Sequence, residues 1–305
     1  MTTTTTTTTT NHQPALSPTS IRASLARDGF VLIPSILSPA ALSTLRAAAT
    51  RTTALTRAGH WPYMRTLPKQ FPPWPSDPTL GIWGVQHLLH PSLPDASLFA
   101  SSYFSAGIMD IVKALLECGD DDLVMELYNL LVRPDADFSL RWHRDDVSAE
   151  ASREEEEERL ARPAFHAQWN LALFDDRSLV VVPGSHARAR TEAERGTGPF
   201  EEGMPGAQVV EMRAGDCVFY DNNILHRGGY SAEVERATLH GSVGMVGHGK
   251  ERARNVLQHG IGAYVEKCDF SGLDAETRRR AEGMRERAVR MGREEGEAGF
   301  FSKDE

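Results

Sequence analysis

Cysteine, long apolar runs and excess basic charge are all scarce in this sequence of 305 residues. Its three cysteines, Cys118, Cys217 and Cys268, are widely spaced and odd in number, which argues against a disulfide framework and fits a reducing compartment. No apolar run approaches the ~18 residues that span a bilayer. The N-terminus also lacks the basic start and apolar run of a signal peptide. We therefore expect a cytoplasmic protein with no membrane partner.

The charge balance narrows the class of partner further. Acidic residues outnumber basic ones by 42 to 33, which gives a formal net charge of -9. Such a chain lacks the basic surface that binds nucleic acid, so we expect no nucleic-acid partner. Hydrophobic residues make up 40% of the chain, which is close to globular averages and sufficient for a sizeable core. The expected partner is a small molecule.

Changes in composition divide the chain into three parts. Residues 1–19 form a threonine-rich tail with too little apolar surface to offset the entropy cost of ordering, so we expect disorder there. Residues 20–265 are expected to form one folded domain. Residues 266–305 are highly charged, and we expect an exposed helix or a fraying tail.

The first part of the domain has the pattern of helices. Residues 20–28 predict a short helix that ends at Gly29 and leads into a strand at residues 30–33. Ser38 and the proline after it predict the start of a second helix that continues to residue 55. Residues 94–119 predict a single further helix with its leucines and isoleucines turned inward.

From residue 123 to residue 238 the pattern changes to short β-rich runs separated by turns. An acidic run at residues 152–163 interrupts this block and predicts a solvated helical insertion, because adjacent like charges repel unless they face water. Helices followed by strands predict a mainly β, α+β fold. In this fold the N-terminal helices pack on one sheet of a double-sheet β-roll.

Residues 60–80 contain six prolines, which forbid regular structure but supply rigid apolar surface. Long loops of this kind are often functional, and we expect this one to border the substrate entrance. The candidate substrate contacts there and in the strand that follows are Trp61, Tyr63, Arg65, Trp74 and His87.

The sequence "FSLRWHRDDV" at residues 138–147 places His143 and Asp145 two positions apart in a predicted strand. Side chains at i and i+2 of a strand project from the same face, so the two can share a metal ion. His226, at the end of another predicted strand, is the third candidate ligand. Two imidazoles and one carboxylate leave coordination sites open, which is typical of non-haem Fe(II) oxygenases.

Arg236 lies ten residues after His226 on a predicted returning strand. A guanidinium binds a carboxylate through two parallel hydrogen bonds and stays charged in a desolvated pocket. Arg236 therefore predicts a site for the far carboxylate of a 2-oxo acid. Further candidates to contact this cosubstrate or the substrate lie on neighbouring predicted strands: Asn129, Gln168, Thr238 and His240.

These motifs together resemble the phytanoyl-CoA dioxygenase family of Fe(II)/2-oxoglutarate oxygenases, and specifically a fungal branch of it. The resemblance covers roughly residues 20–250. It is carried by "DGFVLIP", "GIWGVQHLLHP", "LRWHRDD", "AQWNLALFDD", "VVVPGSH" and "NNILHRGGY".

The resemblance implies a double-stranded β-helix, a jelly-roll or cupin-like core, with His143, Asp145 and His226 as iron ligands and Arg236 as the anchor of 2-oxoglutarate. It also implies hydroxylation of a small organic molecule with O2, coupled to decarboxylation of 2-oxoglutarate to succinate and CO2. Halogenases of the family replace the carboxylate ligand by a small residue, so the presence of Asp145 argues against halogenation.

Two other functions remain open from the sequence. A cupin-like metal enzyme that oxidises or isomerises its substrate without 2-oxoglutarate would keep the three ligands and have no use for Arg236. A non-catalytic β-roll binding module would tolerate loss of the ligands, and the presence of all three argues against it.

Overall fold

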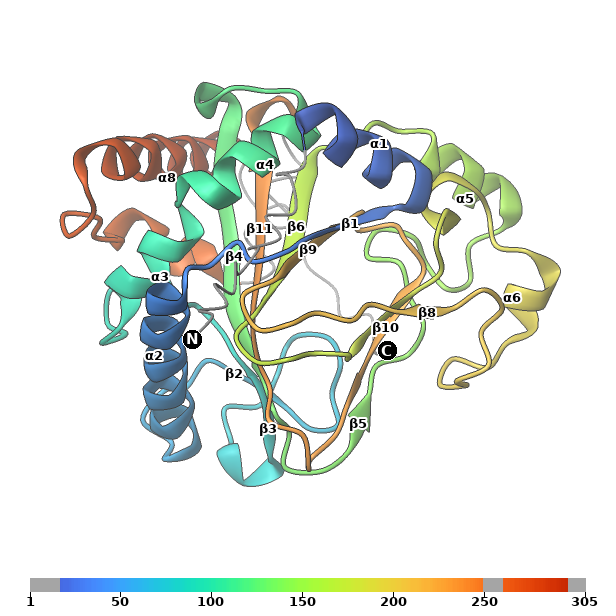
Figure 1. Cartoon of the computed structure of the whole chain (residues 1–305), viewed down its shortest axis with the longest axis horizontal. Helices are drawn as coiled ribbons and strands as arrows, with labels where there is room; N and C mark the ends of the chain where they lie inside the picture. The colour runs from blue at the N-terminus through green and yellow to red at the C-terminus, as the bar shows by residue number, and fades with distance from the viewer. Residues whose placement is uncertain (1–16, 249–259, 296–305) are drawn as a thin grey trace, which may run out of the picture.

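The computed structural model of the chain describes residues 17–248 and 260–295 (Figure 1). Residues 1–16 of the tail predicted to be disordered lie outside the described residues, as do residues 249–259 and 296–305. The last residues of the predicted N-terminal tail, 18 and 19, belong to the first helix. The α-helices of the described residues are α1 (Pro18–Asp28), α2 (Pro39–Arg57), α3 (Ala96–Tyr103), α4 (Ala106–Leu116), α5 (Arg153–Leu160), α6 (Glu192–Gly196) and α8 (Ala275–Glu295).

Two antiparallel sheets form the centre of the molecule. The large sheet has seven strands in the order β1-β9-β6-β11-β4-β3-β2, and the small sheet has the order β5-β10-β7-β8. The large sheet contains β1 (Phe30–Ile33), β2 (Met64–Thr66), β3 (Ile82–Val85), β4 (Leu123–Val132), β6 (His166–Ala172), β9 (Cys217–Tyr220) and β11 (Ala237–Met245). The small sheet contains β5 (Phe138–Ser139), β7 (Leu179–Val181), β8 (Gln208–Val209) and β10 (His226–Tyr230). The predicted α+β double-sheet fold is confirmed.

The first two helices form close to where the sequence predicts them, but α1 begins at Pro18 rather than at residue 20, and α2 continues to Arg57 rather than ending at residue 55. Ser17 and Ser38 each cap a helix by accepting a backbone N–H in the first turn. Gly29 ends α1 with a φ of 79°, a left-handed conformation that glycine adopts without steric cost. The chain then enters β1, so α1 is fixed beside the edge of the large sheet.

The single helix predicted for residues 94–119 is wrong, because the chain forms α3 and α4 with a bend of 43° between them. Phe104 ends the first of these helices, and the Ser105 hydroxyl accepts the N–H of Ile108 to start the second. No single helix among residues 17–248 and 260–295 is long and apolar enough to cross a membrane. The bent pair α3 and α4 passes that test only when the two are joined.

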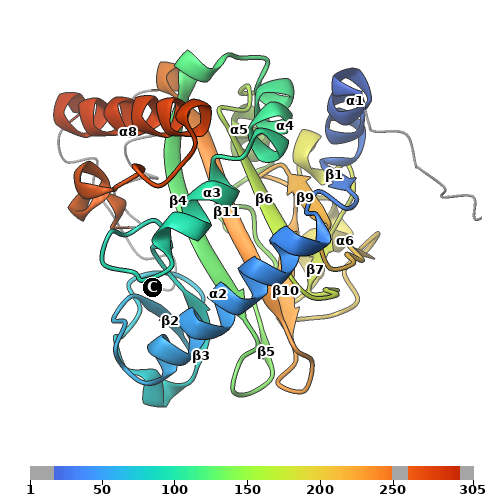
Figure 2. The ribbon, with the colours of Figure 1, turned by 60° about the vertical axis from the view of Figure 1, so that its left-hand side comes forward.

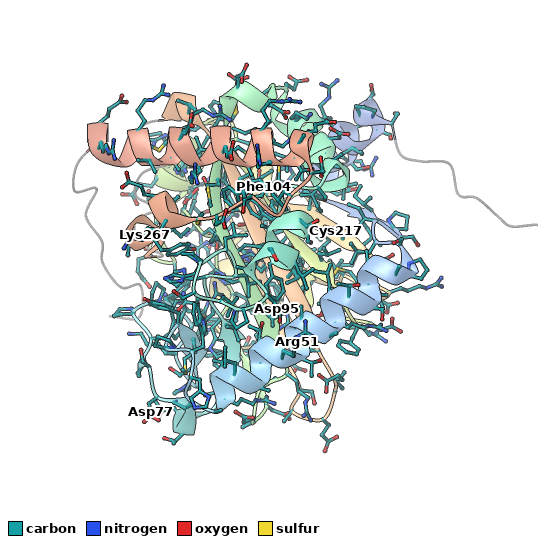
Figure 3. All side chains as sticks on the ribbon, turned by 90° about the vertical axis from the view of Figure 1, so that its left-hand side faces the viewer. Arg51, Asp77, Asp95, Phe104, Cys217 and Lys267 are labelled. Atoms are coloured by element: carbon teal, nitrogen blue, oxygen red, sulfur yellow. The ribbon has the colours of Figure 1, made fainter. Side chains whose placement is uncertain are left out.

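Helices α2, α3, α4 and α8 lie on one face of the large sheet, as Figure 2 shows. The side chains between them and the sheet form the main core, which includes the fully buried Phe99, Met109 and Trp169. Arg51 of α2 forms an ion pair with Asp95 just before α3, and both are labelled in Figure 3. The opposite face of the large sheet is left to line a cavity with the small sheet.

Helix α8 is more firmly packed than its polar sequence predicts. The expectation of an exposed helix is only half right, because one stripe of α8 is buried in the core against β4. That stripe consists of Ala281, Met284, Ala288 and Met291. Arg280 also donates a hydrogen bond of 3.0 Å to the carbonyl of Phe104, which is labelled in Figure 3. The few apolar residues of this segment recur at helical spacing, which is sufficient to dock it.

The acidic run forms α5, the predicted helical insertion. Most of its glutamates are exposed, but Glu156 is fully buried between Arg190 and Arg195. Arg159 near the end of α5 also binds Asp146, one residue after Asp145, at 2.8 Å. This insertion is therefore tied to the loop that carries the candidate metal ligands.

Candidate metal centre and cosubstrate pocket

The structure brings His143, Asp145 and His226 together on the cavity side of the small sheet. Each offers one ligand atom, and the three atoms lie within 4.8 Å of one another. A pair of backbone hydrogen bonds of 3.0 Å joins His143 to His226 in a β-bridge, so the two imidazoles come from facing positions. Their ring centroids are 4.3 Å apart.

Backbone hydrogen bonds orient both imidazoles in the same way. The Nδ1 atom of His143 lies 2.8 Å from the carbonyl of Arg141, and that of His226 lies 2.8 Å from the carbonyl of Ile224. A ring whose Nδ1–H donates to its own chain presents Nε2 as the metal-binding atom. His143 Nε2 is 3.7 Å from Asp145 Oδ1, which is a suitable distance for two ligands of one ion.

Asp145 is held from two sides. Its backbone N–H donates to the carbonyl of Asn222 at 2.8 Å, and Gln168 on β6 donates to its Oδ2 at 3.1 Å. The neighbouring Asp146 accepts hydrogen bonds from Asn222 and Arg159. These contacts connect the ligand loop to the loop before β10 and to α5.

The strand predicted to contain the motif is wrong in its extent, because β5 ends at Ser139. His143 keeps strand-like pairing only through its bridge to His226, and Asp145 lies in a bend. The ligand pair is therefore oriented by the loop contacts described above as well as by alternation along a strand.

Arg236 is buried at the edge of the cavity, where it is paired with Asp176. Its Nε donates to Asp176 Oδ2 at 2.7 Å, and its guanidinium lies 4.2 Å from the centre of the Tyr230 ring. Among the described residues, its Nη1 is buried without a hydrogen-bond partner. A buried N–H without a partner is costly, so this atom marks a place where a ligand oxygen fits.

Asp176 is ionised despite its burial. Burial alone would raise its pKa, but the charge of Arg236 and the hydrogen bonds from Ser178 and Thr238 outweigh that effect and lower the pKa to about 2. The carboxylate thus balances the charge of Arg236. Sequence reasoning missed this residue, because its Asp-Asp dipeptide at residues 175–176 has the pattern of an ordinary turn.

A cavity of about 180 Å³ connects the three candidate ligands to Arg236. It lies between the two sheets and is lined by polar side chains and by aromatic rings, which include Trp74, Trp83 and Tyr230. Of the candidate contacts predicted from the sequence, four more line this cavity: Arg65, Trp74, Gln168 and His240.

The side chains of Asn129 and Thr238 lie beside the cavity and engage protein groups. Thr238 donates to Asp176 at 2.7 Å. Asn129 accepts the N–H of His87 at 3.1 Å, and its Nδ2 is buried without a partner among the described residues. His240 faces Asn170 at 2.9 Å, and burial lowers its pKa to about 3, so its ring is neutral at physiological pH.

Three of the candidate substrate contacts are not part of the cavity wall: Trp61, Tyr63 and His87. They form an aromatic cluster with His90 and Tyr264, in which neighbouring ring centroids are about 5 Å apart. The Trp61 indole donates to the backbone carbonyl next to His87. A contact of these three side chains with the substrate stays a prediction.

Gln70, in the proline-rich loop, is a second residue that sequence reasoning missed. Its amide nitrogen is 3.3 Å from His143 Nδ1, and its oxygen accepts the N–H of Arg141 at 2.8 Å. The adjacent Phe71 packs edge-on against the His143 ring. The loop therefore contacts the ligand motif directly, although no local pattern in the sequence relates the two.

The donor set fits a divalent metal with open coordination sites, and Arg236 Nη1 fits a carboxylate beyond it. A family model, described as phytanoyl-CoA dioxygenase (PhyH), matches residues 25–234. The chain belongs to this family. A comparison with curated protein sequences found no match.

Solved structures with the same fold include AviO1 from Streptomyces viridochromogenes Tue57, at 22% identity and a TM-score of 0.54, covering 76% of this chain and 96% of that one. EctD from S. alaskensis, solved with 2-oxoglutarate and 5-hydroxyectoine, is 19% identical with a TM-score of 0.55, covering 77% and 78% of the two chains. HygX from Streptomyces hygroscopicus, solved with nickel and 2-oxoglutarate, is 17% identical with a TM-score of 0.50, covering 72% and 84%.

Phytanoyl-CoA dioxygenases are Fe(II)/2-oxoglutarate-dependent oxygenases that act on small molecules. The PhyH enzyme described here is accordingly an oxidoreductase that requires Fe(II) and 2-oxoglutarate and uses O2. The similarity to solved structures shows the fold, which is the double-stranded β-helix expected from the sequence.

Proposed function

We propose that this PhyH enzyme hydroxylates a small organic molecule while 2-oxoglutarate is decarboxylated to succinate and CO2. The observation that carries the proposal is the cavity itself, which joins three convergent ligand atoms to a buried arginine with an N–H that has no partner among the residues that the structure describes. We propose His143, Asp145 and His226 as the iron ligands. Arg236 is proposed to bind the far carboxylate of 2-oxoglutarate.

Iron bound at this site supplies the activation of O2 and the oxidation of a substrate C–H bond. The protein contributes orientation and protection. The carbonyls of Arg141 and Ile224 hold the two imidazoles in the tautomer that presents Nε2. The interleaved aromatic rings of the wall, among them Trp74 and Tyr230, exclude water from the region where substrate and cosubstrate meet.

The cosubstrate assignment is tested by Arg236→Ala. If the guanidinium pairs with a buried carboxylate, this change weakens 2-oxoglutarate binding by about 2–5 kcal/mol. Because it also leaves Asp176 unpaired, the double variant D176N/R236Q serves as a second test with balanced charge, and the exposed Arg213→Ala serves as the control. Unchanged affinity in both cavity variants removes the assignment and favours a metal enzyme that does not use 2-oxoglutarate.

The reaction is tested by succinate release with Fe(II), O2 and libraries of natural products, lipids and amino acids. The proposal expects slow uncoupled release without substrate and stimulation by the correct class. A folded protein that binds iron but releases no succinate under any condition contradicts the hydroxylase proposal. We also propose five further contacts of the cosubstrate or the substrate: Gln168, Asn129, Thr238, Trp74 and His240. A cytoplasmic location stays a prediction.

A further inference from the structure

Arg65 crosses a neighbouring strand to reach the cavity. It lies on β2 directly opposite Gly84 of β3, which in turn is opposite Leu131 of β4. A Cβ added at Gly84 would lie 3.0 Å from Cδ of Arg65. The missing side chain at Gly84 thus gives the Arg65 stem room to extend over the sheet, and Arg65 lines the same cavity as Arg236.

The Arg65 guanidinium has aromatic neighbours but no anionic partner. Its Cζ lies 5.1 Å from the ring centroids of both Trp74 and Trp83, and the residue is only 9% exposed. Its Nε is buried without a hydrogen-bond partner in the described part of the chain. Within residues 17–248 and 260–295 no carboxylate forms an ion pair with it. Aromatic faces attract a cation, but they do not neutralise its charge.

Another buried arginine differs from Arg65 at its terminal nitrogens. Arg144 is 4% exposed and its Nε also lacks a partner among the described residues, but its Nη1 and Nη2 donate to the carbonyls of Ser185, Asn223 and Arg188. Burial lowers the pKa of Arg65 to about 10, as it does for Arg144, so both remain cations at neutral pH. The terminal nitrogens of Arg144 have three protein acceptors, whereas among residues 17–248 and 260–295 the guanidinium of Arg65 has none.

The two arginines of the cavity wall differ in how their charges are matched. Arg236 forms a direct ion pair with Asp176. Arg65 has no such pair among residues 17–248 and 260–295, and the carboxylate of Asp145 acts on it through its charge without a direct contact. Burying an isolated charge is costly, and the cost is offset when a bound anion supplies the partner.

We propose that Arg65 is a second carboxylate-binding residue of the cavity, in addition to Arg236. Its partner is the carboxylate of a bound ligand and not a carboxylate of the protein. The inference rests on the proposed function, because the carboxylate comes either from the far end of 2-oxoglutarate or from an acidic substrate. The planar guanidinium fork matches a carboxylate through two parallel hydrogen bonds. Arg65 is thus a determinant of which anions the enzyme accepts.

Binding to the Fe(II)-loaded protein under anaerobic conditions distinguishes the two sources. The variants are Arg65→Met and, as the matched control, the exposed Arg213→Met. The first probes are 2-oxoglutarate and 2-oxopentanoate, which has the same chelating end but a methyl group in place of the far carboxylate. If Arg65 binds that carboxylate, R65M weakens 2-oxoglutarate binding by about 30-fold or more and leaves 2-oxopentanoate binding unchanged.

The second probes are benzoate and hexanoate, titrated into the protein already saturated with Fe(II) and 2-oxoglutarate. If Arg65 binds a substrate carboxylate, these acids bind to wild type and R213M but not to R65M, whereas the affinity for 2-oxoglutarate is unchanged. Equal binding of every probe to R65M and wild type overturns the proposal, as does an equal loss of 2-oxoglutarate and 2-oxopentanoate. A wild type that does not bind 2-oxoglutarate at all refutes the proposed function instead.

Thermal unfolding without any ligand separates binding from a structural role. Replacing an unpaired buried cation by an apolar side chain of similar length is expected to leave the melting temperature unchanged or to raise it. The Arg65→Lys variant, which keeps the positive charge, is measured alongside R65M. A large drop in melting temperature for R65M, with no ligand-specific change in affinity, contradicts a role in anion binding.

Discussion

At the scale of single residues, the site depends on which acceptor receives the hydrogen bond from Nδ1–H of each imidazole. Both histidines use the carbonyl two positions earlier in the chain, at the same distance of 2.8 Å. This repeated local contact orients both rings, and for His143 the side chains of Gln70 and Phe71 add contacts from the proline-rich loop. It explains how two segments that are far apart in the sequence present equivalent nitrogen atoms to one point.

His226→Ala removes one of the three proposed ligands. We expect it to weaken Fe(II) binding by at least about 100-fold, because an incomplete ligand set binds a metal much more weakly. Anaerobic titration with Fe(II) measures the effect, and the exposed His60→Ala is the control. Retention of wild-type affinity in H226A excludes this residue as a ligand.

The Asp176–Arg236 pair makes stability depend on pH in a defined direction. Because the folded-state pKa of Asp176 is lowered from 3.8 to about 2, its contribution is fully present above pH 4 and is lost as pH falls toward 2. From about pH 5 to about pH 3 the wild type is expected to lose about 1 kcal/mol more unfolding free energy than D176N/R236Q. Urea unfolding across this range measures the difference, and identical slopes contradict the assignment.

At the scale of elements, α5 shows how an apparently solvated helix becomes a structural part. Its acidic run predicts a surface helix, and the helix is there. The burial of Glu156 was not predictable, because its partners are 34 and 39 residues away, with Arg190 just before α6 and Arg195 within it. Repulsion between adjacent like charges explains why most glutamates of this helix face solvent, but it does not explain the burial of Glu156.

Glu156→Ala tests the importance of that contact. Removing the carboxylate leaves two half-buried guanidinium groups without their partner, so the unfolding free energy is expected to fall by about 3 kcal/mol. Glu158→Ala on the exposed face, where Glu158 forms an exposed ion pair with Arg162, is expected to change it by less than about 0.5 kcal/mol. Equal effects of the two substitutions in urea unfolding refute a role for Glu156 as an anchor.

At the scale of the whole molecule, the order of helices and strands made the fold predictable. The cap at Ser38 and the stop at Gly29 are local signals that predict α2 and the step from α1 into β1, whereas the cap at Ser17 falls in the part of the chain expected to be disordered. The grouping of His143, Asp145 and His226 could also be predicted, from the i, i+2 spacing of the first two and from the resemblance to the family, although the first two lie in a loop after β5. The roles of these side chains as ligands remain proposals.

The partners of the buried arginines could not be predicted from the sequence. Asp176 is 60 residues from Arg236, and Arg65 depends on a glycine across the sheet whose only contribution is the absence of a side chain. Such contacts are set by strand register, which short motifs do not specify. The break between α3 and α4 was missed for a different reason, because apolar periodicity continues across a serine cap.

The account depends on one claim, that His143, Asp145 and His226 bind a single Fe(II) to which 2-oxoglutarate also binds. Anaerobic absorption spectroscopy tests it most directly, since a 2-oxo acid chelated to Fe(II) gives a weak visible charge-transfer band. The account predicts a band that saturates at one Fe(II) and one 2-oxoglutarate per chain and is absent in H226A but present in H60A. A folded wild type that binds Fe(II) without developing the band, or a band that persists in H226A, contradicts it.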